Sequence, residues 1–175
     1  MAQFTISSGD TLRPFKSRSG GVVLESGPES TAQTFRVGAV LEVDTQVSTS
    51  KHRLRVALTS ASTVTSQGIV GVAAEGASSN TDQTAIYWPV NSDTEFIGRS
   101  RGLALASTQV GNYYGLFYDS TKTVFGVDMA NAVSTSMRVQ VTGLVDDVGD
   151  TGGQVRFKFA VPAGSTNVWG FGGVN

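Results

Sequence analysis

The sequence predicts an all-β protein, folded as an antiparallel β-sandwich or a small β-barrel with an extended N-terminal arm. Of its 175 residues, 23 are Val and only 9 are Leu, and branching at Cβ disfavours helices while it suits strands. Gly (21 residues), Ser (20) and Thr (19) are also abundant, which favours turns. Several segments alternate apolar and polar residues with a period of two, a pattern typical of strands with one buried and one solvated face.

The length suits a single domain with a substantial core. We divide the chain into residues 1–34, an N-terminal arm with edge strands, and residues 35–175, a single antiparallel β domain. Ser, Gly and Pro punctuate the first part and leave short apolar islands at Phe4–Ile6, Phe15 and Val22–Leu24. Because no island is large enough to hold a core, this part can form an extended arm, edge strands or both.

The alternating segments predict the strands of the main domain. In the first of them, Leu41 and Val43 are expected on the buried face and Glu42 and Asp44 on the solvated face. Pro89 indicates that its strand lies at an edge or stops there, because proline cannot donate a ladder hydrogen bond. The clearest strands are Phe35–Thr45, Leu54–Leu58, Ile86–Val90, Met137–Thr142 and Val155–Val161, and weaker patterns predict Ile69–Glu75, Glu95–Gly98, Tyr113–Tyr118 and Thr123–Asp128.

Turn-forming residues separate these strands. Ser120–Thr123 and Asp150–Gly153 have the composition of hairpin loops, and Gly76–Asp82 separates two further strands. The one helical candidate is Asp128–Met137, with Asp128 as a possible N-cap. Its Ser, Thr and Asn content and its short length favour a non-helical structure.

Charge and hydropathy exclude two classes of partner. The net charge is -1, from 13 basic and 14 acidic residues spread along the chain, so we expect no nucleic-acid partner, because binding to phosphates needs concentrated cations. The longest apolar run lies around Ile69–Ala74, far short of the roughly 20 residues that span a bilayer, so we expect no membrane insertion. The N-terminus lacks the features of a signal peptide, and the absence of Cys suits synthesis in a reducing cytoplasm.

Catalytic and metal-binding patterns are scarce, and we expect no enzyme activity and no cofactor. His52 is the only histidine; lying between two cations, it is better explained as a surface residue than as a catalytic base. Asp146, Asp147 and Asp150 cluster on a loop, yet their spacing differs from that of calcium-binding loops, so we expect no metal there. A glycosidase-like pair of carboxylates is not excluded by sequence.

Aromatic residues gather in two places. Tyr113, Tyr114, Phe117 and Tyr118 form the densest cluster, for which we expect core positions plus one exposed pair. The tail from Trp169 to Asn175 is either a terminal strand that closes the core or an apolar segment that docks on another subunit.

Several blocks together resemble the small β-rich virion proteins of tailed bacteriophages, in particular capsid decoration (cement) proteins. The resemblance spans about residues 35–160 and leaves both ends uncovered. The blocks that carry it are Phe35–Thr45, Gly68–Glu75, Asp93–Arg99, Val110–Leu116, Val141–Asp150 and Gln154–Phe159.

The resemblance implies a structural protein without catalysis, made in the host cytoplasm and located on the outer surface of the virion capsid. Its partners would be the major capsid protein and itself, as a homotrimer at local three-fold positions. An extended arm could add a strand to a sheet edge of the shell. On this view we expect Phe4, Ile6, Leu12 and Phe15 to anchor a capsid-binding arm, and Trp169 and Phe171 to mediate self-association.

Two other classes of function remain open. One is another virion component, such as a head-fibre base or a tail protein, and its position in the particle would identify it. The other is a carbohydrate-binding β-sandwich, in which exposed Tyr or Trp side chains stack on sugars.

Overall fold

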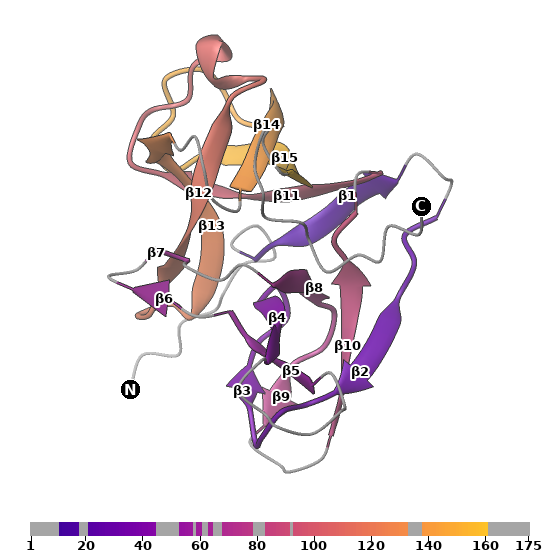
Figure 1. Ribbon diagram of the computed structural model, residues 1–175. Helices are drawn as coiled ribbons and strands as arrows, with labels where there is room; N and C mark the ends of the chain where they lie inside the picture. Colours follow the sequence, from indigo (N-terminus) through magenta and orange to yellow (C-terminus); the bar gives the residue numbers. More distant parts are fainter. Residues whose placement is uncertain are drawn as a thin grey trace.

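A computed structural model defines the fold (Figure 1). It describes residues 11–17, 21–44, 53–57, 59–60, 63–64, 68–78, 83–91, 93–132 and 138–160.

The larger of two main sheets contains eight strands, five of which close into a barrel. The cycle runs β11-β15-β14-β12-β13 and back to β11, and only its last step, from β13 to β11, is parallel. β1 extends the sheet beyond β11, and β7 and β6 extend it beyond β12. The strands are β1 (Arg13–Ser17), β6 (Thr59–Ser60), β7 (Thr63–Val64), β11 (Thr94–Arg101), β12 (Tyr113–Asp119), β13 (Val124–Ala132), β14 (Arg138–Leu144) and β15 (Gln154–Ala160).

The second main sheet has five antiparallel strands in the order β2-β10-β8-β4-β5 and lies below the barrel in Figure 1. An isolated parallel bridge between Glu29 and Leu54 connects its two ends, so this sheet also curls toward closure. The strands are β2 (Glu25–Pro28), β4 (Val40–Asp44), β5 (Arg53–Val56), β8 (Ile69–Ala73) and β10 (Thr84–Pro89).

Short elements complete the fold. β3 (Thr34–Phe35) pairs with β9 (Ala77–Ser78), and Ser107–Gln109 forms one 3-10 turn. The described part of the chain contains no α-helix, which confirms the predicted all-β class and its barrel alternative. In the same residues, no helix has the length and apolar character needed to cross a membrane.

The centre of the closed barrel is aromatic. Phe96, Phe157 and Phe159 are almost fully buried, with ring centroids between 5.3 and 6.1 Å apart. Leu12, which directly precedes β1, is 0% exposed and reaches the same core next to Gly98. A Cβ at Gly98 would lie 2.3 Å from the Leu12 side chain, so this glycine makes the space that Leu12 fills.

The predicted alternation is confirmed in the last two strands. In β15, Val155, Phe157 and Phe159 are buried, while Arg156 and Lys158 are only partly covered. β10 ends at Pro89. This confirms one of the two alternatives predicted for this proline, namely that its strand stops there.

The non-helical structure favoured for residues 128–137 is confirmed for residues 128–132, which belong to β13. Asp128 is not a helix cap, because β13 continues through Ala132 and pairs with both β12 and β11. The residues of β13 from Val124 to Met129 are all buried. Both edges of β13 take part in closing the barrel. Val133–Met137 lies outside the described residues.

The N-terminal part forms edge strands over its described length. β1 and β2 are the terminal strands of the two main sheets, and β1 pairs with β11 while β2 pairs with β10. Leu12 belongs to the same hydrophobic cluster as the barrel core. Residues 1–10 and 18–20 of the predicted arm lie outside the described part of the chain.

Candidate functional site: two surfaces of the barrel

Phe15 forms the centre of one candidate binding surface. It lies in β1 between Pro14 and Lys16, where the register shifts against β11, and is 49% exposed. The Arg156 guanidinium lies 5.4 Å from the ring centroid and the Lys16 ammonium 5.9 Å from it. Cation–π contacts of this kind favour this position of the ring, so Phe15 is a partly exposed aromatic side chain with two cationic neighbours.

A buried carboxylate forms an ion pair with Lys16, one of these two cations. Glu95 on β11 is 7% exposed, and its Oε2 lies 3.1 Å from the Lys16 ammonium. Burial by itself raises the pKa of Glu95, but hydrogen bonding by Lys16 and Thr142 and the charges of Lys16 and Arg156 leave the pKa below its ordinary value. Gly143 gives Arg156 its room, since a Cβ there would lie 2.3 Å from Nη2.

Exposed apolar residues continue beyond β1. Val22, Val23 and Leu24 are 37%, 63% and 55% exposed and lead directly into β2. Of the nine large apolar side chains that are exposed in the described residues, four are therefore Phe15 and Val22–Leu24, which we call the apolar strip. β1 lies beside β11 of the barrel, and β2 lies beside β10 of the second sheet (Figure 1). Exposed apolar side chains of this kind are candidates for protein–protein contact.

The predicted anchor residues separate into three groups. Phe15 is exposed, as an anchor requires. Leu12 is fully buried; its place in the barrel core does not fit the expected role of capsid anchor, because it has no surface to offer in this fold. The remaining predicted anchors and self-association residues lie outside the described residues: Phe4, Ile6, Trp169 and Phe171.

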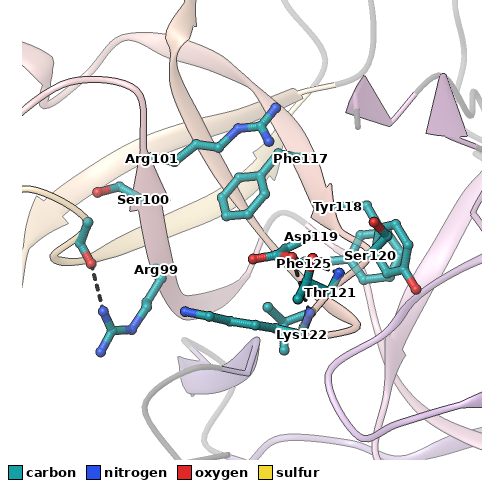
Figure 2. A pocket seen from close by; sticks show the side chains of 12 residues that line it. Arg99, Ser100, Arg101, Phe117, Tyr118, Asp119, Ser120, Thr121, Lys122 and Phe125 are labelled. Carbon is teal, nitrogen blue, oxygen red and sulfur yellow. Dashed lines mark hydrogen bonds between the residues drawn. The ribbon is translucent and has the colours of Figure 1, made fainter. Parts of the chain in front are cut away.

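A second candidate surface is a hollow of about 350 Å³ beside the turn between β12 and β13 (Figure 2). Arg99 and Arg101 enter it from β11, and Lys122 enters it from the turn. Phe117 and Phe125, both buried, and half-buried Tyr118 add aromatic surface to its lining.

Structural contacts fix the two arginines. Arg101 binds Oδ2 of Asp128 through Nε at 3.1 Å and Nη2 at 2.8 Å, and its guanidinium lies 4.4 Å from the centroid of the Phe117 ring. Arg99 donates from Nη1 to the Gly152 carbonyl at 3.2 Å. The sequence contained part of this signal, because Arg-Ser-Arg in a strand places both arginines on one face; the contribution of Lys122 depends on the path of the turn.

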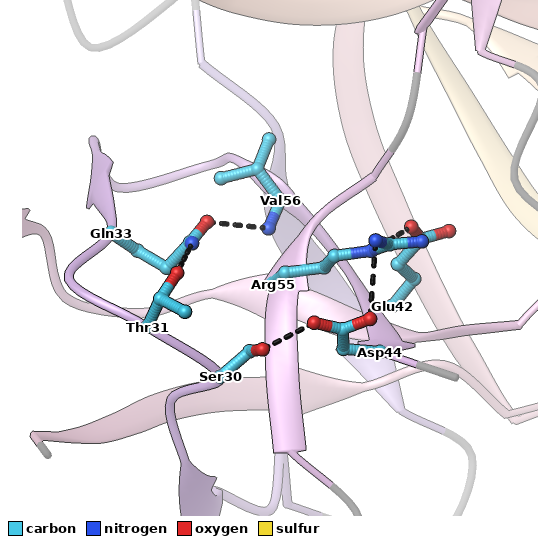
Figure 3. A network of polar contacts seen from close by, with 7 residues as sticks. All are labelled: Ser30, Thr31, Gln33, Glu42, Asp44, Arg55 and Val56. Carbon is cyan, nitrogen blue, oxygen red and sulfur yellow. Dashed lines mark hydrogen bonds and ion pairs between the residues drawn. The ribbon is translucent and has the colours of Figure 1, made fainter. Parts of the chain in front are cut away.

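A polar network on the second sheet has a structural role (Figure 3). Arg55 on β5 contacts Glu42 at 2.7 Å and Asp44 at 3.1 Å, both on β4, and the Ser30 hydroxyl donates to Asp44. Glu42 is only 3% exposed, so its expected position on a solvated face is wrong. The network fastens the chain after β2 onto β4 and β5, and it is completed by the Gln33 side chain, which accepts a hydrogen bond from the Val56 amide.

The aromatic cluster of β12 is mainly core. Tyr114 and Phe117 are 5% and 6% exposed, while Tyr113 and Tyr118 are half-buried. The register of β12 against β13 shifts between Tyr114 and Gly115, which changes the simple alternation. Tyr114 therefore cannot stack on a sugar in this fold.

The acidic loop is used for local structure. Asp146 accepts a hydrogen bond from the Gln154 amide at 2.8 Å, which helps to close the loop between β14 and β15. Asp146, Asp147 and Asp150 are all described, and the described residues include no group of three or more His, Cys, Asp or Glu placed to hold a metal ion. His52 lies outside those residues.

Comparisons with protein-family models, with curated proteins and with solved structures gave no match for this chain.

Proposed function

We propose that this chain is a virion structural protein that decorates the outer surface of a tailed-phage capsid, binding the major capsid protein and acting as a homotrimer. The resemblance of its sequence blocks to decoration proteins supports this function. A barrel with an exposed apolar strip beside its N-terminal strand is also well suited to binding another protein surface.

The exposed ring of Phe15, with its two cationic neighbours, is the observation that carries the proposal. Aromatic and arginine side chains dominate the energetics of protein interfaces. Arg156 and Lys16 lie near the ring in the unbound protein, and contacts that favour one ring position reduce the rotamer entropy lost on binding. Val22–Leu24 adds three further exposed apolar side chains in the same N-terminal part.

Self-association would multiply a modest contact. After one subunit of a trimer has bound, the other two bind from a high effective concentration, and the overall affinity exceeds that of a single contact. A trimer that touches several capsid subunits would thereby hold them together against the pressure of packaged DNA.

The test is co-sedimentation with expanded shells that lack the decorating protein. We expect Val23→Asp and Leu24→Asp to weaken binding by at least tenfold, because each places a charge within the apolar strip. Val148→Asp is the matched control: Val148 is 66% exposed on the β14–β15 loop, so the same change there should leave binding intact.

A deletion should be limited to residues 2–10. A longer deletion through residue 20 would also remove Leu12 from the core and β1 from the sheet, and loss of folding would then imitate loss of binding. Circular dichroism should be unchanged in each variant that is tested. Full binding by Val23→Asp and Leu24→Asp, or equal loss with Val148→Asp, would refute the role of the apolar strip.

The position of the protein in the particle separates decoration from the other virion roles. Density on the outer capsid surface, at three-fold positions, is the expected result in a map of the native particle. Density confined to the tail or to a head fibre would exclude the decoration function.

A further inference from the structure

We propose that residues 29–33, which follow β2, form a latch that closes the second sheet against β5 and opens without unfolding of the rest of the chain. Figure 3 shows the side-chain contacts that hold this latch. Its opening is a property of the unbound protein and does not depend on the proposed capsid-binding function.

The junction between the latch and β5 is the shortest reason for this proposal, because its neighbours are full ladders. Four residue pairs join β4 to β5, and four join β2 to β10. The latch meets β5 at an isolated bridge between Glu29 and Leu54, beside which the Ser30 amide donates to the Leu54 carbonyl at 2.8 Å. The Glu29 carbonyl also accepts a hydrogen bond from Nη1 of Arg53 at 2.9 Å. Few bonds therefore have to break for the latch to open.

Side chains supply further closing contacts. The Ser30 hydroxyl donates to Asp44 on β4, and the Gln33 side chain accepts a hydrogen bond from the Val56 amide at 3.4 Å. Each contact of this kind contributes only modestly to stability, because water replaces it when the groups separate. The latch is thus held mainly by contacts that water can replace.

A buried oxygen favours the open state. Glu29 is only 2% exposed, and its Oε2 has no hydrogen-bond partner among the described residues. Burial of a polar atom without a partner costs free energy, which is recovered when water reaches the atom. The closed latch carries this cost, and the neighbouring ladders do not.

We expect β2 to stay in place when the latch opens. The Glu29 amide donates to the Gln83 carbonyl at 2.9 Å on the side of β10. The Leu54 side chain also packs against Gly27 in β2, where a Cβ would lie 2.9 Å from its Cδ1. Opening would therefore uncover the Leu54 carbonyl and the Val56 amide at the edge of β5, and a free edge of this kind can accept an extended strand from another chain.

Native-state hydrogen exchange of the full chain, measured by NMR, tests the latch. We expect the Ser30 and Val56 amides to have similar protection factors, about tenfold or more below those of the most protected amides of β15, which report global unfolding. The Glu29 amide should be better protected than the Ser30 amide. Equal protection of Ser30, Val56 and β15 would overturn the proposal, because the latch would then open only with the whole fold.

Two variants and a matched control complete the test. Glu29→Met removes the unpaired oxygen at a similar side-chain length and should raise protection of the Ser30 amide about tenfold. Ser30→Ala removes the hydroxyl that binds Asp44 and should lower the protection of the same amide about fivefold. Glu75→Met is the control, because Glu75 is exposed, and it should change this protection less than about twofold.

The variants also define what would contradict the latch. Lower protection of the Ser30 amide in Glu29→Met would overturn the role of the buried oxygen, as would an equal rise in Glu75→Met. Unchanged protection of the Ser30 and Val56 amides in Ser30→Ala would overturn the closing role of the hydroxyl. Circular dichroism should show the same β-sheet content in every variant.

Discussion

Gly126 lies at the seam that closes the barrel, and replacing it with Ala should destabilise the whole fold. A Cβ at this position would lie 2.5 Å from the Arg99 carbonyl oxygen and 2.5 Å from Cε1 of Phe117. Neither neighbour can yield cheaply: the carbonyl belongs to β11, and the Phe117 ring is buried and lies under Arg101. The seam itself is short, since β11 and β13 pair only at Ser100–Val127 and Arg101–Asp128.

The size of the effect follows from these contacts. Overpacking of a core costs about 1–3 kcal/mol, and strained ladder hydrogen bonds add about 1 kcal/mol each. The reduced entropy of the unfolded chain on Gly→Ala offsets about 0.4–1 kcal/mol of this. We therefore expect a loss of about 3 kcal/mol, equivalent to a decrease in Tm of about 6–12 °C for a chain of this size.

Thermal and urea denaturation followed by circular dichroism would measure this change. Gly21→Ala is the control, because a Cβ at Gly21 meets no atom within 4 Å, and its stability should stay within about 0.5 kcal/mol of the wild type. The reasoning is refuted if Gly126→Ala melts within about 2 °C of the wild type, or if Gly21→Ala loses as much stability.

Three further predictions concern other parts of the fold. Gly71→Ala should lower Tm in denaturation experiments, because a Cβ there would lie 2.2 Å from Cδ2 of Tyr87; an unchanged Tm would contradict the tight packing of the second sheet. Burial, and then the hydrogen bond to Glu25, raise the pKa of Tyr87 to about 12. The neutral Tyr87 side chain therefore stabilises the fold fully below about pH 10, and this stabilisation is lost as the pH rises through about 12. Ultraviolet titration should show this late ionisation, and Tyr87→Phe should remove it. The pKa of Glu95 is lowered in the folded state, so its pairing with Lys16 stabilises the fold above the ordinary Glu pKa and is lost as the pH falls through the folded value. Glu95→Gln should lower Tm at neutral pH, and the difference in Tm from the wild type should disappear in acid. A difference that stays constant with pH would contradict the role of the Glu95–Lys16 pair.

Sequence patterns were sufficient where one face of a strand meets only the core. The alternation of Val155, Phe157 and Phe159 with polar residues depends on nothing outside the strand and its apolar partners. The alternation predicted a solvated side chain for Glu42, and this was wrong. Glu42 is buried and pairs with Arg55 in a polar network that also contains Ser30. Its burial depends on a loop that follows a different strand, which no local period reveals.

The same limit applies to both candidate surfaces. Leu12 and Phe15 lie three positions apart in the N-terminal part, yet the first is fully buried and the second is half exposed. The difference arises at Gly98, far along the chain, whose missing side chain leaves space for Leu12 alone. In the hollow, the spacing of Arg99 and Arg101 was readable from sequence, whereas the approach of Lys122 required the folded turn.

The structure also changes how the N-terminal part would contact a capsid. Strand addition needs a segment whose backbone is available, but residues 13–17 already pair with β11. The strand moreover carries three features that discourage edge-to-edge pairing, namely Pro14 without an N–H, a register shift at Phe15 and a lysine at position 16. Contact by residues 13–17 is therefore expected to use side chains, with Phe15 as the exposed anchor. Val23→Asp and deletion of residues 2–10 should consequently weaken binding independently, and their effects in a double variant should add.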